Sequence, residues 1–268
     1  MDIFTTKLNS MKYLIFFALT IITGNSFSQG TKKDKDFYEM RIYEFHSADQ
    51  QKLIDGFIST ALIPYLHSKK INNIGAFTAL VNDTAKIKKI FVLIPYKKLA
   101  DIPSINKSMF ADKNVLLNGE SYLNATSENP AYDRMMSIIM EGFRFSPILT
   151  PPALSNSITE KVYELRSYES ASEKKYWKKV EMFNEGGEIP LFARLGFNAV
   201  FYAEVISGPS MPNLMYMTSF ESMASRDEHW KSFSNDPEWK KLSSMKEYEK
   251  TVSKNTITFL KATSYSEY

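Results

Sequence analysis

Apolar and polar residues alternate in the same order in two nine-residue stretches of this 268-residue chain, residues 37–45 and 162–170. Tyr, Glu, Arg, Tyr and Glu recur in both stretches at an offset of 125 residues. Such alternation is typical of a half-buried β-strand, whose successive side chains point to opposite faces of the sheet. The pattern therefore predicts two copies of one structural unit, each opening with this strand.

A helical pattern follows each opening strand. Ser47 and Ser172 are the expected N-caps, and apolar residues recur behind them at helical spacings. Pro64 is expected to kink or restart the first helix, and Pro190 to begin a new helical piece after the second. The remaining expected elements are strands at 76–81, 90–94 and 142–145 and a helix starting at 129–132 in the first copy, then strands at 199–206, 214–220 and 255–262 and helices from Ser222 and Asn235 in the second.

Each copy thus has the element order β-α-β-β-α-β, which is that of the ferredoxin-like unit. Its antiparallel sheet carries helices on one face, and the bare apolar face must be covered. Two tandem units can cover each other and close a barrel between their sheets. The predicted fold class is therefore α+β, with a first repeat at residues 37–146, a linker at 147–159 and a second repeat at 160–268.

The polar side of the repeated strand holds the leading candidate residues, which are Glu164, Arg166 and Tyr168 in the second copy and Glu39, Arg41 and Tyr43 in the first. A guanidinium beside a carboxylate and a phenol can hold an anionic or carbonyl-bearing ligand. The alternative is an internal salt bridge, because a buried arginine needs a carboxylate and the nearby glutamate supplies one. We expect Tyr163 and Leu165 to pack on the helices, so that the polar side faces the barrel interior.

Two histidines are candidate general bases: His67, which follows Pro64, and His229, which lies in an Arg-Asp-Glu-His-Trp segment. An imidazole with a pKa of about 6.5 suits proton transfer. Each histidine also has a structural interpretation, His229 at the surface or in a cap and His67 near a helix C-terminus. In the ligand hypothesis Arg166 orients the ligand, Glu164 and Tyr168 position or exchange protons, and His67 or His229 is the base.

Composition excludes several classes of protein. The net charge is +3 and there is no cysteine, so disulfides, thiolate nucleophiles and cysteine-ligated metal sites are excluded. Lysines occur in scattered pairs rather than long runs, which argues against a nucleic-acid partner. The histidines lack metal-ligand spacing. We therefore expect a small-molecule partner, no metal and no cofactor; homo-oligomers remain open.

The N-terminus resembles a targeting segment. Lys12 precedes an apolar run at residues 13–22, and Ser26 and Ser28 fit a small-residue cleavage site before Gln29. The run is too short for a membrane span, which needs about 20 residues. The sequence predicts a signal peptide at residues 1–28 and a periplasmic or secreted protein without stable membrane insertion after cleavage; the alternative is an uncleaved anchor or a buried helix.

Several segments of the chain resemble the NIPSNAP family, in particular its exported bacterial members with two copies of the domain. They are the paired YEMRIY and YELRSY openings, the LGFNAVFYAEV strand, the LMYMTSFESMASRDEHWKSFSNDPEWKKL block and the closing FLKATSYSEY. The likeness is strong in the second repeat and degenerate in the first, which lacks the Arg-x-x-His-Trp and Pro-x-Trp signals.

The resemblance implies the dimeric α/β-barrel superfamily, whose ferredoxin-like units here would form a pseudo-dimer within one chain. That superfamily includes small cofactor-independent monooxygenases and members without known activity, and the family has no established reaction to transfer. Our first functional hypothesis is binding of a small carbonyl-bearing or aromatic metabolite in the inter-sheet cavity, in one version as a cofactor-independent enzyme. The alternative is a non-catalytic binding or protein-interaction module.

Overall fold

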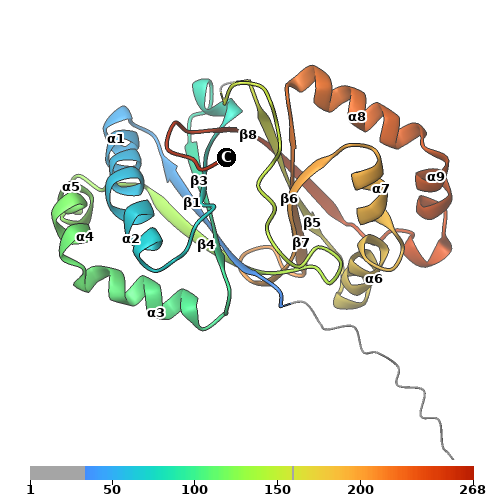
Figure 1. Cartoon of the computed structure of the whole chain (residues 1–268), viewed down its shortest axis with the longest axis horizontal. Helices are drawn as coiled ribbons and strands as arrows, with labels where there is room; N and C mark the ends of the chain where they lie inside the picture. The colour runs from blue at the N-terminus through green and yellow to red at the C-terminus, as the bar shows by residue number, and fades with distance from the viewer. Residues whose placement is uncertain (1–33, 159) are drawn as a thin grey trace, which may run out of the picture. The chain divides into compact units, whose positions relative to one another are not determined.

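Eight antiparallel strands close into a barrel, and two groups of helices cover its outer face on opposite sides (Figure 1). The computed structural model describes residues 34–158 and 160–268. Around the barrel the strands follow the order β1, β3, β2, β8, β5, β7, β6 and β4, and β4 pairs with β1 again. The bounds are β1 Phe37–Phe45, β2 Gly75–Ala79, β3 Lys88–Tyr96, β4 Arg134–Gly142, β5 Val162–Glu169, β6 Asn198–Ser207, β7 Asn213–Phe220 and β8 Lys254–Ala262. The predicted α+β class with a closed barrel is confirmed.

The first half of the chain, residues 34–158, supplies one group of helices, and the second half, residues 160–268, supplies the other (Figure 1). The bounds are α1 Ala48–Phe57, α2 Ile63–Ser68, α3 Asp101–Ser108, α4 Lys113–Asn118 and α5 Glu120–Leu123, then α6 Glu173–Phe183, α7 Glu188–Arg194, α8 Met223–Asn235 and α9 Pro237–Ser243. Ser47, Ser172 and Ser222 cap α1, α6 and α8 as predicted, each accepting a backbone N–H bond in the first turn.

Pro64 restarts the first helix as predicted. A π-helical segment, Ile58–Leu62, joins α1 to α2, and Pro64 lies in the first turn of α2. A proline is tolerated there because its missing N–H is one that a helix start leaves unpaired. The first helical segment is therefore divided into α1 and α2, which the π-helical residues join.

Two elements predicted for the first half are wrong. Residues 129–132 start no helix, because Asp133 donates its backbone N–H to the carbonyl of Glu44 and ties this segment to the end of β1. Strand β4 then begins at Arg134, earlier than the strand predicted at 142–145. The helices of this region come instead from α3, α4 and α5, in a stretch whose sequence is only partly periodic.

The predicted orientation of the repeated strand is also wrong. Tyr163 and Leu165 lie in the apolar cluster that fills the barrel, together with Tyr38 and Met40 of β1. The polar side of β5 faces the helices, where Arg166 lies over the ring of Trp230 of α8. Alternation fixes which residues share a side, but both sides of this strand are buried, so it does not say which side is inward.

Aromatic side chains close one end of the barrel. Tyr38 packs on Phe201 of β6 at 5.4 Å between ring centroids, and Phe77 of β2 packs on Tyr163 at 4.8 Å. The ring of Tyr268 joins them, 5.8 Å from Phe77. A side chain at position 75 would collide with Phe77 and Tyr268, so a glycine there gives these rings their space.

The two halves meet at two seams, β2 against β8 and β4 against β6. The first seam has three paired residues on each strand and the second has four, whereas β1 and β3 pair over nine. Both seams lie at the aromatic end, because β8 pairs through residues 260–262 and β4 through residues 139–142. At the other end of the barrel the halves are not joined by these ladders.

The predicted signal peptide, residues 1–28, lies outside the described residues. Within the described part of the chain, no helix combines the length and the hydropathy that a membrane crossing requires.

Candidate functional site

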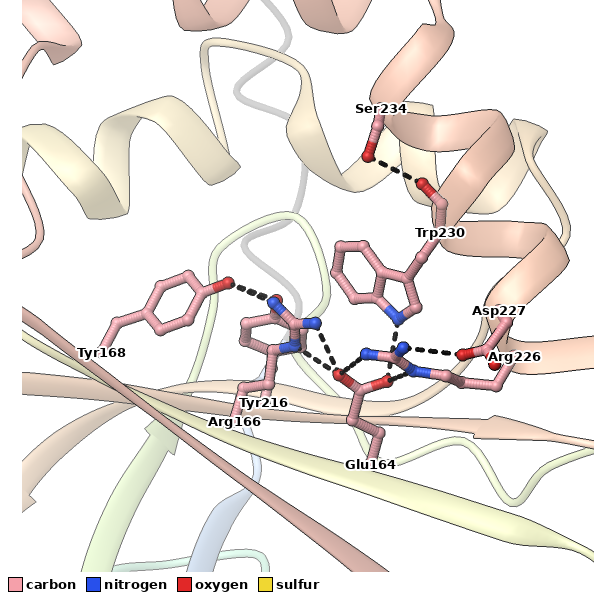
Figure 2. A network of polar contacts seen from close by, with 8 residues as sticks. All are labelled: Glu164, Arg166, Tyr168, Tyr216, Arg226, Asp227, Trp230 and Ser234. Carbon is pink, nitrogen blue, oxygen red and sulfur yellow. Dashed lines mark hydrogen bonds and ion pairs between the residues drawn. The ribbon is translucent and has the colours of Figure 1, made fainter. Parts of the chain in front are cut away.

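The polar side of β5 converges on one carboxylate. Glu164 is fully buried and accepts hydrogen bonds from Arg166, Arg226 and Trp230, the last two on α8 (Figure 2). The distances to the three donor nitrogens are 2.6 Å from Arg166 Nε, 2.7 Å from Arg226 Nε and 2.8 Å from Trp230 Nε1. One carboxylate therefore joins β5 to α8.

Two guanidinium groups keep Glu164 charged. Burial disfavours the charge, but the hydrogen bonds from Arg226 and the attraction of Arg166 outweigh burial and lower the pKa of Glu164 below its usual value. Asp227 accepts a further bond from Arg226 at 2.9 Å. The cluster is a buried ion-pair network rather than a proton-exchanging group.

Arg166 has its partners within the protein. Its Nη1 donates to the hydroxyl of Tyr168 at 3.1 Å, and that hydroxyl lies 2.9 Å from the hydroxyl of Tyr216 of β7 (Figure 2). Its guanidinium carbon lies 3.7 Å from the centroid of the Trp230 ring, which covers it. This geometry is that of the internal salt bridge, the alternative interpretation of the sequence.

A second buried ion pair joins α6 to α7. Lys179 of α6 contacts Glu188 of α7 at 2.7 Å, and each residue is less than 5% exposed. Burial raises the pKa of Glu188, and the charge of Lys179 offsets only part of that effect. The lysine nitrogen also lies 4.6 Å from the ring of Phe183. The sequence pattern does not predict that this pair is buried, because a lysine and a glutamate on helices are usually surface residues.

The counterpart network of the first half has a different set of partners. Arg41 donates to Glu39 at 3.0 Å and to Asn106 of α3 at 2.6 Å. Glu39 also accepts hydrogen bonds from Ser137 of β4 and Tyr96 of β3. Burial opposes the charge on Glu39, but the charge of Arg41 and the hydrogen bonds from Arg41, Asn106 and Ser137 outweigh burial and lower the pKa of Glu39.

Arg41 borders a pocket between the sheet and the helices of the first half. This sheet–helix pocket has a volume of about 460 Å³, which is within the usual range for small-molecule sites. Its lining is largely aromatic and includes Tyr43, Phe57, Phe110, Tyr122 and Tyr132. The Nε of Arg41 is buried and has no hydrogen-bond partner among the described residues. The predicted residues Arg41 and Tyr43 thus lie together at a cavity.

The aromatic rings of this pocket pack on one another. Tyr122 stacks on Phe57 with 4.0 Å between centroids, and Tyr43 meets Tyr132 edge-on at 5.7 Å. Burial, and then the neighbouring Tyr43 and Tyr132, raise the pKa of Tyr122 well above that of a free phenol. At neutral pH this hydroxyl therefore remains protonated and can donate a hydrogen bond.

The polar partners of the two predicted histidines lie outside both networks. His229 faces its own helix, with Nδ1 2.7 Å from the carbonyl of Ser225, and its ring packs near Phe197 and Phe220. His67 pairs with Glu267 at the protein surface. The structure therefore brings Glu164, Arg166 and Tyr168 together, and Glu39, Arg41 and Tyr43 together, without either histidine.

Seven network residues were not predicted as site residues: Arg226, Asp227, Trp230, Tyr216, Asn106, Ser137 and Tyr96. Arg226 and Trp230 had a visible signal, because they lie four apart on a helix and so share a face. Asn106 and Ser137 lie in segments whose structure the sequence did not predict correctly. Among residues 34–158 and 160–268, no group of His, Asp and Glu side chains is arranged to hold a metal ion.

Comparison with known proteins agrees with the fold. The NIPSNAP family model matches residues 163–267. A Fusobacterium nucleatum protein with a provisional monooxygenase assignment is 7% identical, with a TM-score of 0.56 over 86% of this chain and 93% of that one. A Lactobacillus acidophilus protein with the same kind of assignment is 9% identical, with a TM-score of 0.53 over 85% and 94%.

A NIPSNAP family protein from Agrobacterium tumefaciens is 19% identical and covers 43% of this chain and 97% of its own, with a TM-score of 0.36. Among curated proteins none matches. The fold of this chain, a closed antiparallel eight-stranded barrel with helices outside it, is thus similar to the folds of these two solved structures. Residues 163–267, which hold β5 to β8 and the network around Glu164, are a NIPSNAP domain.

Proposed function

We propose that the protein binds a small carbonyl-bearing or aromatic metabolite in the sheet–helix pocket of its first half. The observation that carries the proposal is Arg41, a buried cation at the wall of a cavity, whose Nε–H has no acceptor among the described residues. A buried donor without an acceptor costs about 1–3 kcal/mol, and a ligand oxygen placed there removes that cost. Arg41 would supply the polar anchor of the site.

The walls of the pocket fit the same ligand class. Tyr43, Phe57 and Tyr122 present ring faces and edges on which an aromatic or planar ligand can pack. The protonated hydroxyl of Tyr122 would add a second donor. A ligand with an aromatic body and a carbonyl or carboxylate group satisfies both features.

This proposal changes the location of the site but keeps the ligand. From the sequence we predicted a ligand in the inter-sheet cavity, oriented by Arg166. Arg166 is covered by Trp230 and bonded to Glu164 and Tyr168, which favours a structural role for the second network. Within the pair of repeats, the degenerate first one is therefore the better candidate for binding.

Burial keeps Tyr122 protonated, which favours binding through a donated hydrogen bond over proton abstraction by this phenol. A non-catalytic binding module therefore stays the alternative to an enzyme. The provisional monooxygenase assignments of the two fold neighbours suggest the reaction to assay, which is cofactor-free oxygen consumption with each ligand found. We would propose an enzymatic function only if the protein converts a ligand that it binds.

A thermal-shift screen with aromatic carboxylates, aldehydes and ketones tests binding. We expect at least one compound to raise the melting temperature, and Arg41→Met to weaken its binding about 10–100-fold, since a charge-assisted hydrogen bond contributes about 1.5–3 kcal/mol. Glu39 keeps Asn106, Ser137 and Tyr96 as partners in that variant. The control is Arg134→Met, which removes an exposed arginine of β4. A screen without hits, or equal affinity in wild type and Arg41→Met, would reject the proposal.

The architecture that we propose for this function is a pair of tandem ferredoxin-like repeats acting as a pseudo-dimer. The strand orders β4-β1-β3-β2 and β8-β5-β7-β6 support it, because each half repeats the same order. The boundaries remain those given above, residues 37–146, 147–159 and 160–268.

Export of the protein is the last part of the proposal. The signal-like segment at residues 1–28 supports it. We expect mass spectrometry of the protein from its native host to find a mature N-terminus near Gln29, in the periplasm or the medium. Recovery of uncleaved protein from the cytoplasm would contradict export.

A further inference from the structure

We infer that the open end of the barrel is a second binding site, for an uncharged and largely apolar molecule that carries one hydrogen-bonding group. This barrel mouth is a cavity of about 460 Å³ between the two halves. It shares no lining residue with the sheet–helix pocket, so the inference goes beyond the proposed function and stands independently of it.

Apolar side chains from both halves form the walls of the mouth. Five strands contribute Ile42, Phe91, Met136, Ile138, Leu165 and Met215. Val81 and Ile87 extend this surface outward, and they are 62% and 52% exposed. Contiguous exposed apolar surface of this kind marks a binding site, because covering it removes apolar area from water.

The two ends of the barrel differ. Tyr38, Phe77, Tyr163 and Tyr268 fill the aromatic end, where the two seams also pair. Toward the mouth the inward side chains of β8 are smaller, Thr256 and Thr258, and the seams are not paired. The barrel is therefore a cup with a closed floor, a shape that lets an eight-stranded barrel hold one small ligand.

Charges at the rim already have opposite partners. Lys254 pairs with Glu169 at 3.0 Å, and Lys89 pairs with Glu44 at 2.9 Å. An ionic ligand group would have to break one of these pairs and lose its own hydration, which is unfavourable beside apolar walls. The rim therefore favours an uncharged ligand.

Hydroxyl and amide groups on the wall can orient such a ligand. Asn213 and Ser167 bond to each other at 2.9 Å across β7 and β5. None of the described residues hydrogen-bonds to the hydroxyls of Thr256 or Thr258, which line the same cavity. A ligand hydroxyl or carbonyl can bond to either threonine while its apolar part contacts Leu165 and Phe91.

Fluorescence titration of the full chain with N-phenyl-1-naphthylamine, an uncharged apolar dye, tests the inference. We expect saturable binding, displacement by 1-decanol, and displacement by decanoate that is at least about tenfold weaker. Thr256→Trp is expected to weaken dye binding about tenfold or more by filling the mouth. Its site is exposed, so the folded core is not disturbed. Leu165→Trp fills the cavity from the wall and gives a second, independent variant.

The matched control is Leu117→Trp, which adds the same ring at an exposed position of α4, 72% accessible to solvent. Dye binding in this variant should equal that of the wild type. The inference is overturned if the wild type shows no saturable binding, if both mouth variants bind as tightly as the control, or if decanoate competes as well as decanol. If the ligand screen with Arg41→Met fails but the dye titration gives the expected result, only the proposed function is rejected. If the dye titration fails but the screen with Arg41→Met gives the expected result, only the barrel-mouth site is rejected.

Discussion

Glu164→Gln is expected to lower the free energy of unfolding by about 3 kcal/mol or more at neutral pH. Removing one partner of a buried ion pair costs about 3–5 kcal/mol, because the remaining charge stays buried without compensation. Glu164 is the shared partner of Arg166 and Arg226 and is fully buried. The lower end of the range applies because the side chain of Arg226 is 17% exposed and keeps Asp227.

The effect should depend on pH with a definite sign. The folded-state pKa of Glu164 is lowered, so its charge stabilises the fold above the usual carboxyl pKa and this contribution is lost as pH falls through the lower folded-state value. The difference between wild type and Glu164→Gln should therefore be full at pH 7 and shrink in acid.

Urea unfolding followed by tryptophan fluorescence measures this effect, since Trp230 belongs to the network. The matched control is Glu169→Gln on the same strand. Glu169 pairs with Lys254, whose side chain is 64% exposed, so that change should cost only about 0–1 kcal/mol. Equal losses in the two variants would show that the network does not hold α8 to the sheet.

Lys179→Met is expected to give the second largest loss, about 3 kcal/mol at pH 7.5. It leaves Glu188 in a site where both members of the pair are less than 5% exposed. Methionine keeps much of the apolar contact with Phe183, so the loss reports mainly the missing charge.

This variant should recover stability as pH falls. The folded-state pKa of Glu188 is raised by burial, and removing Lys179 raises it further. Between the unfolded-state pKa and the raised folded-state pKa, the folded protein holds a proton that the unfolded chain releases, so lower pH favours folding of the variant. The loss relative to wild type should thus be smaller at pH 5 than at pH 7.5.

The double variant Lys179→Met with Glu188→Gln is the control for this prediction. It removes both charges and should recover most of the stability, because replacing a buried pair by neutral groups is often close to neutral. A double variant as unstable as Lys179→Met, or a loss that does not change between pH 5 and pH 7.5, would contradict the assigned role of Glu188.

Local signals in the sequence predicted much of the fold. The repeated strand, the serine caps of α1, α6 and α8 and the break at Pro64 are short-range features with direct physical causes. The helix expected at residues 129–132 failed because Pro130 suits a turn as well as a helix start. Only the tertiary hydrogen bond from Asp133 to Glu44 decides between the two.

The sequence predicted which polar side chains of the repeated strand lie together but not what surrounds them. Alternation grouped Glu39, Arg41 and Tyr43 correctly, yet both sides of the strand are buried and the choice of side depends on what packs there. The partners that make Arg166 structural, Arg226 and Trp230, come from α8, which is far away in the sequence. The environment of Arg41, whose buried Nε has no hydrogen-bond partner among the described residues, depends on the placement of α3 and α5, whose positions the sequence pattern did not predict.

Because the two seams are short, the two halves of the barrel can rotate against each other more easily than the strands within one half can separate. Within each half the strands pair over most of their length, while the halves are joined by three and four residue pairs at the aromatic end. The least costly deformation is therefore a small rotation of one half against the other about that end. Such a rotation widens the mouth without breaking a ladder inside either half, so a ligand broader than the resting opening could enter while both halves stay folded.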